Sequence, residues 1–354
     1  MRTTPTDTLL RSVGYPDETG EVTPIEPTES NELYALARRN KVASLYVRVL
    51  HDEGHLSTLT DEWNDRRRFQ ERQQRTLERA VERMPANAEY ALVKSSHDVW
   101  VDSKDLDFVV YHPSLDALEE VFLSEGYEFC GRSPSSFDVL DPETDIQLDV
   151  QDSFSLQRVV YFDRETIRDR IEDRERGGVT VPCASRPDEL AIIVIHSITE
   201  QLFLLKEFYA AVVMLQQFSE EEFRTFLDVV DENRIGAACS AFFTVVRELC
   251  RESFDEEPPY LDEILSRYGE SEAERSALRS DGFETPHRYT GRTGVRTVVD
   301  KLRSPSFSRS LLGQVPRMLS PPTAYHILSQ IVLRRTRKDY VHDTSERTEN
   351  SPDP

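Results

Sequence analysis

Residues 93–110 read VKSSHDVWVDSKDLDFVV, and the last six of them decide the fold. Asp105 and Asp107 stand two apart in an apolar run, which predicts a β-strand with both carboxylates on one side, because strand side chains alternate with a period of two. Charge in a buried strand is costly unless something neutralises it. Divalent metal ions prefer such hard carboxylate oxygens. The stretch therefore indicates a metal site, and the alternative is a pair of solvated acids on an edge strand.

A third carboxylate follows about forty residues later, in the turn and strand DIQLDV at 145–150. This segment alternates strictly, so Asp145, Gln147 and Asp149 would share the face opposite the core. Asp149 is the favoured third acid because hydrophobic residues flank it, and Asp145 is the competing candidate. Acidic residues number 65 of 354, so an acid-x-acid pair proves nothing without its apolar context.

The periodicity of the remaining chain predicts an α+β protein. Apolar residues recur at helical spacing on both sides of the two acidic strands, with a break near Asn40. The expected strands lie at 90–93, 106–111, 127–130, 137–140 and 145–150. The expected helices lie at 31–50, 60–84, 115–126, 164–176 and 323–335, with a core helix or helix pair at 190–218 and further helices within 220–250.

These elements predict three parts. The first folded part spans residues 30–160 and consists of N-terminal helices followed by a small mixed β-sheet core at about 88–160. A mainly helical C-terminal domain occupies residues 161–342. Residues 1–29 are rich in Thr, Pro, Glu and Asp, and residues 343–354 lack large apolar side chains. Both end segments are therefore expected to be disordered.

The charge of the chain indicates the salt concentration in which the protein works rather than the kind of ligand that it binds. The chain carries 43 basic and 65 acidic residues, a net charge of -22, and its basic residues are six lysines and 37 arginines. This balance resembles the proteins of halophilic microbes, in which concentrated salt screens surface charge. It carries no strong signal for DNA binding. The sequence contains no expected membrane span and no secretory signal, so we expect a cytoplasmic protein.

The acidic strands and the turn before them resemble the DNA-polymerase-β-like nucleotidyltransferase superfamily. Its pattern is a Gly-Ser turn, then a strand with two acids flanking a hydrophobic residue, then a third acid on another strand. Ser95-Ser96, Asp105, Asp107 and Asp149 stand at these positions. The resemblance implies a small mixed sheet that transfers a nucleoside monophosphate (NMP) from a nucleoside triphosphate (NTP).

The flanks narrow the resemblance to the stand-alone nucleotidyltransferase family proteins. The matching segments are LARRNKV at 36–42, an arginine-rich helix, ALVK at 91–94, and PDEL at 187–190 leading to His196. The family implies two N-terminal helices and a helical C-terminal region around the core. It also implies Mg²⁺ or Mn²⁺ as cofactor, an NTP as substrate, and an unidentified acceptor that is a small molecule, tRNA or protein.

The resemblance assigns roles residue by residue. Asp105, Asp107 and Asp149 would be the catalytic residues and the metal ligands. The nucleotide-binding residues would be Lys94, Ser95, Ser96 and Lys104.

Two departures from the family pattern keep other functions open. Ser95-Ser96 stands where a glycine usually lets the backbone approach the triphosphate, and Lys104 is the nearest cation where an arginine is usual. One alternative is a catalytically degenerate module that senses nucleotides or binds protein. Another is a toxin–antitoxin-type transferase that modifies tRNA or protein, because SKDLDF at 103–108 is similar to abortive-infection transferases.

Overall fold

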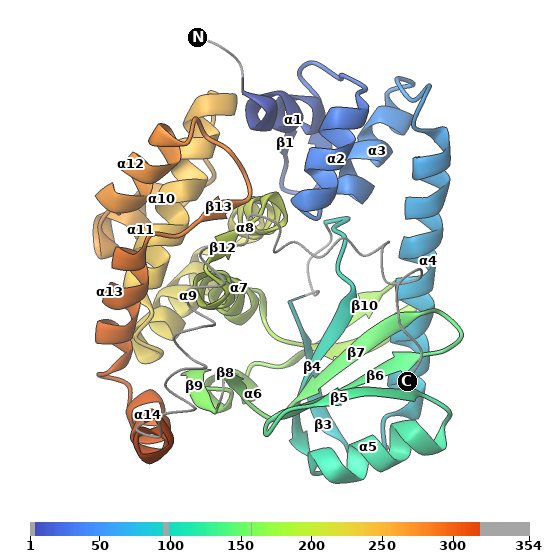
Figure 1. Cartoon of the computed structure of the whole chain (residues 1–354), viewed down its shortest axis with the longest axis vertical. Helices are drawn as coiled ribbons and strands as arrows, with labels where there is room; N and C mark the ends of the chain where they lie inside the picture. The colour runs from blue at the N-terminus through green and yellow to red at the C-terminus, as the bar shows by residue number, and fades with distance from the viewer. Residues whose placement is uncertain (1–3, 95–98, 157, 319–354) are drawn as a thin grey trace.

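The computed structural model describes residues 4–94, 99–156 and 158–318, and it has the expected α+β architecture (Figure 1). Its centre is a mixed seven-stranded sheet in the order β10-β11-β3-β4-β7-β6-β5, in which β11 and β3, and β4 and β7, are parallel pairs. The strands are β3 (Glu89–Val93), β4 (Asp105–His112), β5 (Glu128–Arg132), β6 (Ser136–Asp141), β7 (Ile146–Gln151), β10 (Glu172–Arg176) and β11 (Val179–Cys183).

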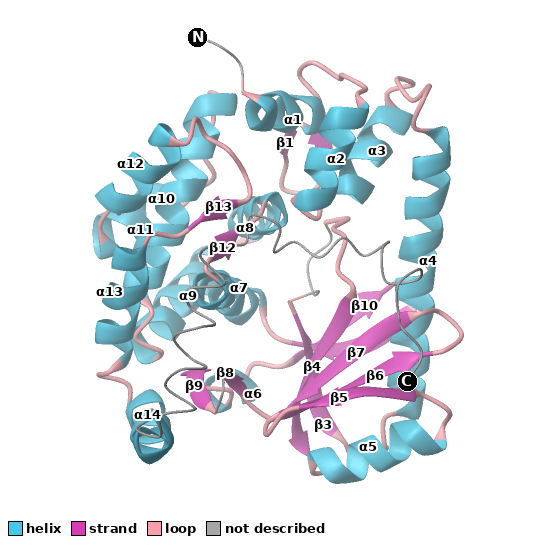
Figure 2. Cartoon of the chain, in the orientation of Figure 1, coloured by secondary structure: helices cyan, strands magenta, loops and turns pink. Residues whose placement is uncertain are grey.

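One face of this sheet packs on α4 (Thr60–Arg83) and α5 (Leu115–Ser124) (Figure 2). Every second residue of the central strands enters this apolar layer, among them Leu106 and Phe108 of β4 and Leu148 of β7. The residues between them must point to the other face, because strand side chains alternate. The packing of this layer therefore decides which face carries the polar residues.

The N-terminal helices break where the sequence predicts, between α2 (Asn31–Arg39) and α3 (Ala43–Asp52). The expectation of disorder over residues 1–29 is wrong where the structure describes them. Residues 5–13 form helix α1 (Pro5–Val13), whose Leu9, Leu10 and Val13 are fully buried. The spacing of these three residues makes an apolar stripe that the polar composition of the whole segment conceals. The helix is followed by a hairpin of β1 (Tyr15–Pro16) and β2 (Val22–Thr23).

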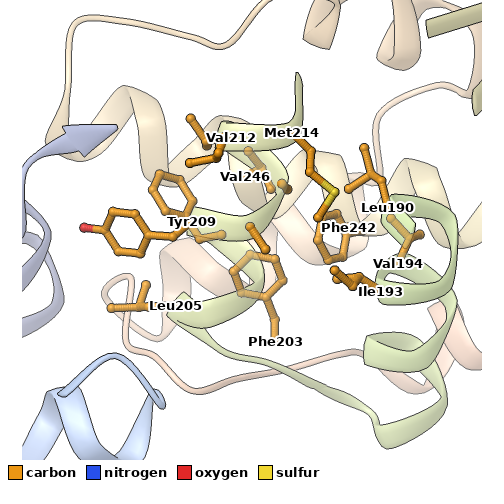
Figure 3. Close-up of a cluster of buried hydrophobic side chains, with 14 of the residues drawn as sticks. Leu190, Ile193, Val194, Phe203, Leu205, Tyr209, Val212, Met214, Phe242 and Val246 are labelled. Carbon is orange, nitrogen blue, oxygen red and sulfur yellow. The ribbon is translucent and has the colours of Figure 1, made fainter. Parts of the chain in front are cut away.

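The C-terminal part is mainly helical, and its interior is formed by α7, α8 and α10 (Figure 3). Phe203, Tyr209 and Phe242 are fully buried there. The helices are α6 (Glu165–Arg168), α7 (Arg186–Glu200), α8 (Leu205–Gln217), α9 (Glu220–Glu232), α10 (Gly236–Ser253), α11 (Leu261–Tyr268), α12 (Glu272–Ser280), α13 (Gly291–Lys301) and α14 (Pro305–Met318). Two small antiparallel sheets accompany them. One is the hairpin of β8 (Phe154–Leu156) and β9 (Val159–Phe162), and the other pairs β12 (Leu202–Phe203) with the distant β13 (His287–Arg288).

The expected helix at 164–176 is wrong. The chain forms only the single turn α6 there and then enters β10, which turns at Gly177-Gly178 and pairs antiparallel with β11. All five residues of β10 are charged, so the segment has no apolar periodicity, and its partner strand determines its structure. The sheet consequently continues past residue 160, into the region assigned to the helical domain.

Two of the expected segments, the helix near 323–335 and the tail 343–354, lie outside the described residues. Within the described ranges, no helix has the length and apolar character needed to cross a membrane.

Candidate active site

The register of two parallel strands brings the predicted acids together. β4 and β7 are neighbours in the sheet, and Asp107 lies directly opposite Asp149, as Asp105 lies opposite Gln147. Leu106 belongs to the apolar layer against α4 and α5, so Asp105 and Asp107 lie on the other face. The described structure thus places the three predicted carboxylates on one face of two adjacent strands.

Asp145, the competing third acid, is not on this face. It lies in the turn before β7, its backbone is left-handed with φ of 60°, and its side chain is exposed. Its N–H donates to the carbonyl of Asp141 at 2.8 Å, so the strand begins only at Ile146. The alternation predicted for 145–150 is therefore correct from residue 146 onward and wrong at its first position.

A fourth carboxylate, Asp138, was missed in the sequence. β6 runs antiparallel to β7 and sets Asp138 opposite Asp149. Burial raises the pKa of Asp138, the Gln147 side chain lowers it by a hydrogen bond, and the charges of Asp105 and Asp107 raise it further. The signal was present, because Phe137 and Val139 face the core and leave Asp138 on the polar face.

The predicted nucleotide-binding residue Lys94 pairs with the acids directly. Its Nζ lies 2.6 Å from Asp107 Oδ1, and both side chains are largely buried. Burial alone would lower the pKa of Lys94, but Asp107, Tyr161 and Asp149 raise it above its ordinary value. Lys94 follows the end of β3, where Val93 lies opposite Asp107 in the register.

A buried carboxylate from the helical part holds the backbone at Lys94. The N–H of Lys94 donates to Glu189 Oε2 at 2.8 Å, and Glu189 is fully buried in the first turn of α7. Lys94 has a left-handed backbone with φ of 61°, a conformation that is unfavourable without glycine. The Glu189 hydrogen bond therefore fixes a strained residue directly before Ser95 and Ser96, the predicted nucleotide contacts, which lie outside the described residues.

The three carboxylates differ in their affinity for a proton. Burial and the nearby charge of Asp107 raise the pKa of Asp149 to about 8. Burial also raises the pKa of Asp107, although Lys94 opposes it. For Asp105, burial acts in the same direction, but Lys41, Lys94 and the Ser103 hydroxyl outweigh it and lower the pKa. Unequal pKa values within one buried cluster are typical of functional sites.

The comparison with protein families adds an independent observation on this segment. Residues 102–251 match the family model of an uncharacterised nucleotidyltransferase. The matched span contains Asp105, Asp107, Asp138, Asp149 and Glu189 and ends in α10. It supports a nucleotidyltransferase family, and with it a transferase that uses a nucleotide. No curated protein and no solved structure matches the chain.

The matched nucleotidyltransferase span begins in a segment that the N-terminal helices hold. Asp102 accepts hydrogen bonds from the N–H of Ser44, at 3.1 Å, and from its hydroxyl. Ser103 Oγ donates to Asp105 Oδ1 at 2.9 Å, and the carbonyl of Lys104 accepts from the Gln147 N–H at 3.4 Å. The N-terminal helices therefore position the chain just before the acidic strand.

The donor set fits a divalent metal ion of the Mg²⁺ type. The side chains are all carboxylates, and Asp149 Oδ1 is buried with no hydrogen-bond partner in the described part of the chain. Among the described residues, however, no three His, Cys, Asp or Glu side chains are arranged so that together they could hold a metal ion. The ammonium of Lys94 lies against Asp107 instead. A metal ion at Asp107 would compete with this ammonium for the carboxylate.

Proposed function

We propose that the protein is a Mg²⁺- or Mn²⁺-dependent nucleotidyltransferase that transfers an NMP from an NTP to a hydroxyl or phosphate of an acceptor. The observation that carries the proposal is the pairing of Asp107 with Asp149 across β4 and β7, inside the span that matches the nucleotidyltransferase family. The acceptor would be a small molecule, tRNA or protein, and the reaction would take place in the cytoplasm.

The proposed roles follow from the positions of the acids. Asp105, Asp107 and Asp149 would hold the metal, and Asp149 would also take the proton of the attacking acceptor group. Divalent ions bound there would neutralise phosphate charge and lower the pKa of the attacking hydroxyl. The acceptor oxygen forms a bond to the α-phosphorus, the bond from that phosphorus to the bridging oxygen breaks, and pyrophosphate leaves with its electron pair.

Lys94 would exchange one partner for another. Without ligand its ammonium neutralises Asp107, and a compact ammonium with three donors also suits phosphate oxygens. Once Asp107 binds metal, Lys94 would be available to the triphosphate. Ser95, Ser96 and Lys104 remain the other proposed nucleotide contacts.

The test uses purified protein in molar KCl with Mg²⁺, each α-phosphate-labelled NTP and a soluble extract. We expect label to move to an acceptor, and the D105A/D107A variant to lose at least about 100-fold of this transfer, because metal-bound charge stabilisation contributes several kcal/mol. Asp145→Ala is the matched control, since it removes an exposed acid from the turn before β7, and it should transfer at the normal rate.

The other outcomes identify the competing functions. Tight NTP binding without transfer would favour the nucleotide-sensing module. Growth arrest on expression, abolished by Asp107→Ala, would favour the toxin-type transferase. Equal transfer by the wild type and the D105A/D107A variant would refute the proposed site.

A further inference from the structure

Besides Lys94, the lysines Lys41 and Lys206 act electrostatically on Asp105, and Asn40 positions both of them. Asn40 is fully buried between α2 and α3. Its Oδ1 accepts from the N–H of Leu205 and its carbonyl accepts from the N–H of Lys206, each at 3.2 Å. Its Nδ2 donates to the carbonyls of Leu36 and Thr285. These bonds join the α2–α3 turn to the start of α8, so Lys41 and Lys206 become neighbours.

Lys41 is also tied to the acidic strand. Its backbone is left-handed, with φ of 55°, and its carbonyl accepts from the N–H of Asp102 at 2.9 Å. Asp102 begins the short segment that leads into Asp105. The turn that carries Lys41 is therefore fixed both to α8 and to the entrance of β4.

The two ammonium groups repel each other. The charge of Lys206 is the largest influence on Lys41 and lowers its pKa, burial lowers it further, and Asp105 and Glu207 oppose both effects. Both lysines are half-buried. Like charges held close together in a half-buried place cost stability, and an anion between them would remove that cost.

The position of Lys206 in its helix also disfavours its positive charge. It lies in the first turn of α8, where the positive end of the helix dipole disfavours a cation and attracts an anion. Glu207 neutralises the charge of Lys206 only in part. Its Oε1 lies 3.5 Å from Lys206 Nζ, and its Oε2 accepts from the N–H of Leu204.

The presence of lysine rather than arginine at these positions supports a role in binding. The chain has only six lysines among 43 basic residues, and three of them, Lys41, Lys94 and Lys206, act electrostatically on Asp105. Arginine is the usual cation of this chain. A compact ammonium that can turn between carboxylate and phosphate oxygens explains the exception.

A neutral histidine completes the group. His196, on α7, is close enough to Lys94, Lys206 and Lys41 that their charges, after burial, lower its pKa well below its ordinary value. Its Nδ1 is buried and has no hydrogen-bond partner in the described part of the chain. An uncharged imidazole beside three cations can bind a phosphate oxygen without adding to their repulsion.

We propose that Lys41 and Lys206, with His196, form a phosphate-binding site beside Asp105. The inference rests on the proposed nucleotidyltransferase function for its biological meaning, and its ligand is a phosphate group. That group is either the triphosphate of the NTP or a phosphate carried by the acceptor. The N-terminal helices thereby contribute a binding residue to a site that the sheet and α7–α8 form.

The experiment measures binding, so it does not depend on transfer. Calorimetry at fixed ionic strength follows inorganic phosphate, tripolyphosphate and NTP with Mg²⁺, for the wild type and for Lys41→Gln, Lys206→Gln and the double variant. Arg303→Gln is the control for net charge, because its side chain is 73% exposed. We expect each lysine variant to lose at least tenfold in phosphate or tripolyphosphate affinity, and the control to stay within twofold.

The arms separate the two sources of phosphate. If the site takes the triphosphate, tripolyphosphate and NTP compete, and the variants weaken both. If it takes an acceptor phosphate, inorganic phosphate binds together with NTP, and the variants weaken only the phosphate. Unchanged affinity for all three probes in the double variant would overturn the inference.

Two further results distinguish a binding role from an effect on folding, and this inference from the proposed function. Removing one of two repelling charges should leave the melting temperature of the ligand-free protein equal or higher, so a lost affinity with an unchanged melting temperature marks a binding role. Phosphate binding through Lys41 and Lys206 in a protein that transfers no label would refute the proposed function and leave this inference standing.

Discussion

Lys94 Nζ lies 2.6 Å from Asp107 Oδ1, and this ion pair joins the end of β3 to the centre of the acidic face. Three neighbouring strands create it. β3 ends beside Asp107, β4 carries Asp107, and β7 places Asp149 on its other side. One cation consequently lies against an acid that has a second buried acid as its neighbour, so the pair holds together a cluster that would otherwise repel itself.

Replacing Lys94 should therefore affect stability and activity together. Lys94→Met leaves Asp107 and Asp149 buried without their cation, and breaking a buried pair in this way costs about 3–5 kcal/mol. Urea unfolding should show this loss, and transfer should fall at least tenfold. The exposed pair of Arg224 with Glu220 offers the control, since Arg224→Met should change stability by less than about 1 kcal/mol. Equal stability losses in both variants would show that Lys94 is not a buried partner.

Asp149 should behave in the opposite way. Its charge is opposed by burial and by Asp107, which raise its pKa to about 8. Asp149→Asn removes that opposition, so the ligand-free protein should be as stable as the wild type or more so, while transfer falls at least about 100-fold. Natural active sites often give up stability in this way. A variant that unfolds more easily than the wild type would instead assign Asp149 a structural role.

Lys301 supplies a pH dependence far from the acids. Its Nζ donates to the carbonyl of Asn233 at 2.6 Å, and burial lowers its pKa to about 8, although Asp163 opposes the shift. The unfolded chain, with an ordinary lysine pKa of about 10.4, then binds more protons than the folded protein between these values. The free energy of unfolding should rise across this window by up to about 1.4 kcal/mol per pH unit.

The measurement is urea unfolding of the wild type and Lys301→Met at pH 7, 8, 9 and 10. The difference between the two proteins isolates Lys301 from the tyrosines that also titrate at high pH. It should shift in favour of the wild type from pH 8 to pH 10. A constant difference would show that Lys301 keeps an ordinary pKa in the folded protein.

Local patterns in the sequence predicted much of the fold. The α2–α3 break at Asn40, the long helix α4 and the two acidic strands follow from apolar periodicity and turn residues within a few positions. Helix α1 and strand β10 could not be predicted in the same way. The apolar stripe of α1 is short and lies in a polar segment, and β10 has no apolar residue at all, so pairing with β11 rather than its own apolar pattern decides the structure of β10.

The residues of the site also fall into those that local sequence patterns predict and those that they do not. Asp105, Asp107 and Asp149 stand out because each acid lies between apolar residues, and Lys94 was predicted from the family resemblance. Sheet register, which joins residues forty apart, then determined which acids meet. Lys41, Lys206 and Glu189 lie more than 50 residues from Asp105, Lys41 in the α2–α3 turn and the other two in helices. The segments around Lys41 and Glu189 resemble the family, but no local pattern shows that these residues meet the acidic strand.

Glu189 provides the sharpest test of this long-range arrangement. Its Oε2 accepts the N–H of Lys94 at 2.8 Å, and that residue needs support because its backbone is left-handed. Glu189→Gln keeps an oxygen that can accept this bond, so transfer should fall only a few-fold. Glu189→Leu has a similar length but no acceptor, and it leaves the buried N–H of Lys94 unpaired, which costs about 1–3 kcal/mol.

The two Glu189 variants separate positioning from charge. If Glu189 acts through the backbone of Lys94, Glu189→Leu should weaken NTP binding and transfer at least tenfold more than Glu189→Gln, because the backbone of Lys94 loses the acceptor that fixes it. If the carboxylate charge itself is required, Glu189→Gln should lose as much activity as Glu189→Leu. Kinetics with a labelled NTP, together with the melting temperature of each variant, decide between these results, and equal losses would refute the positioning role.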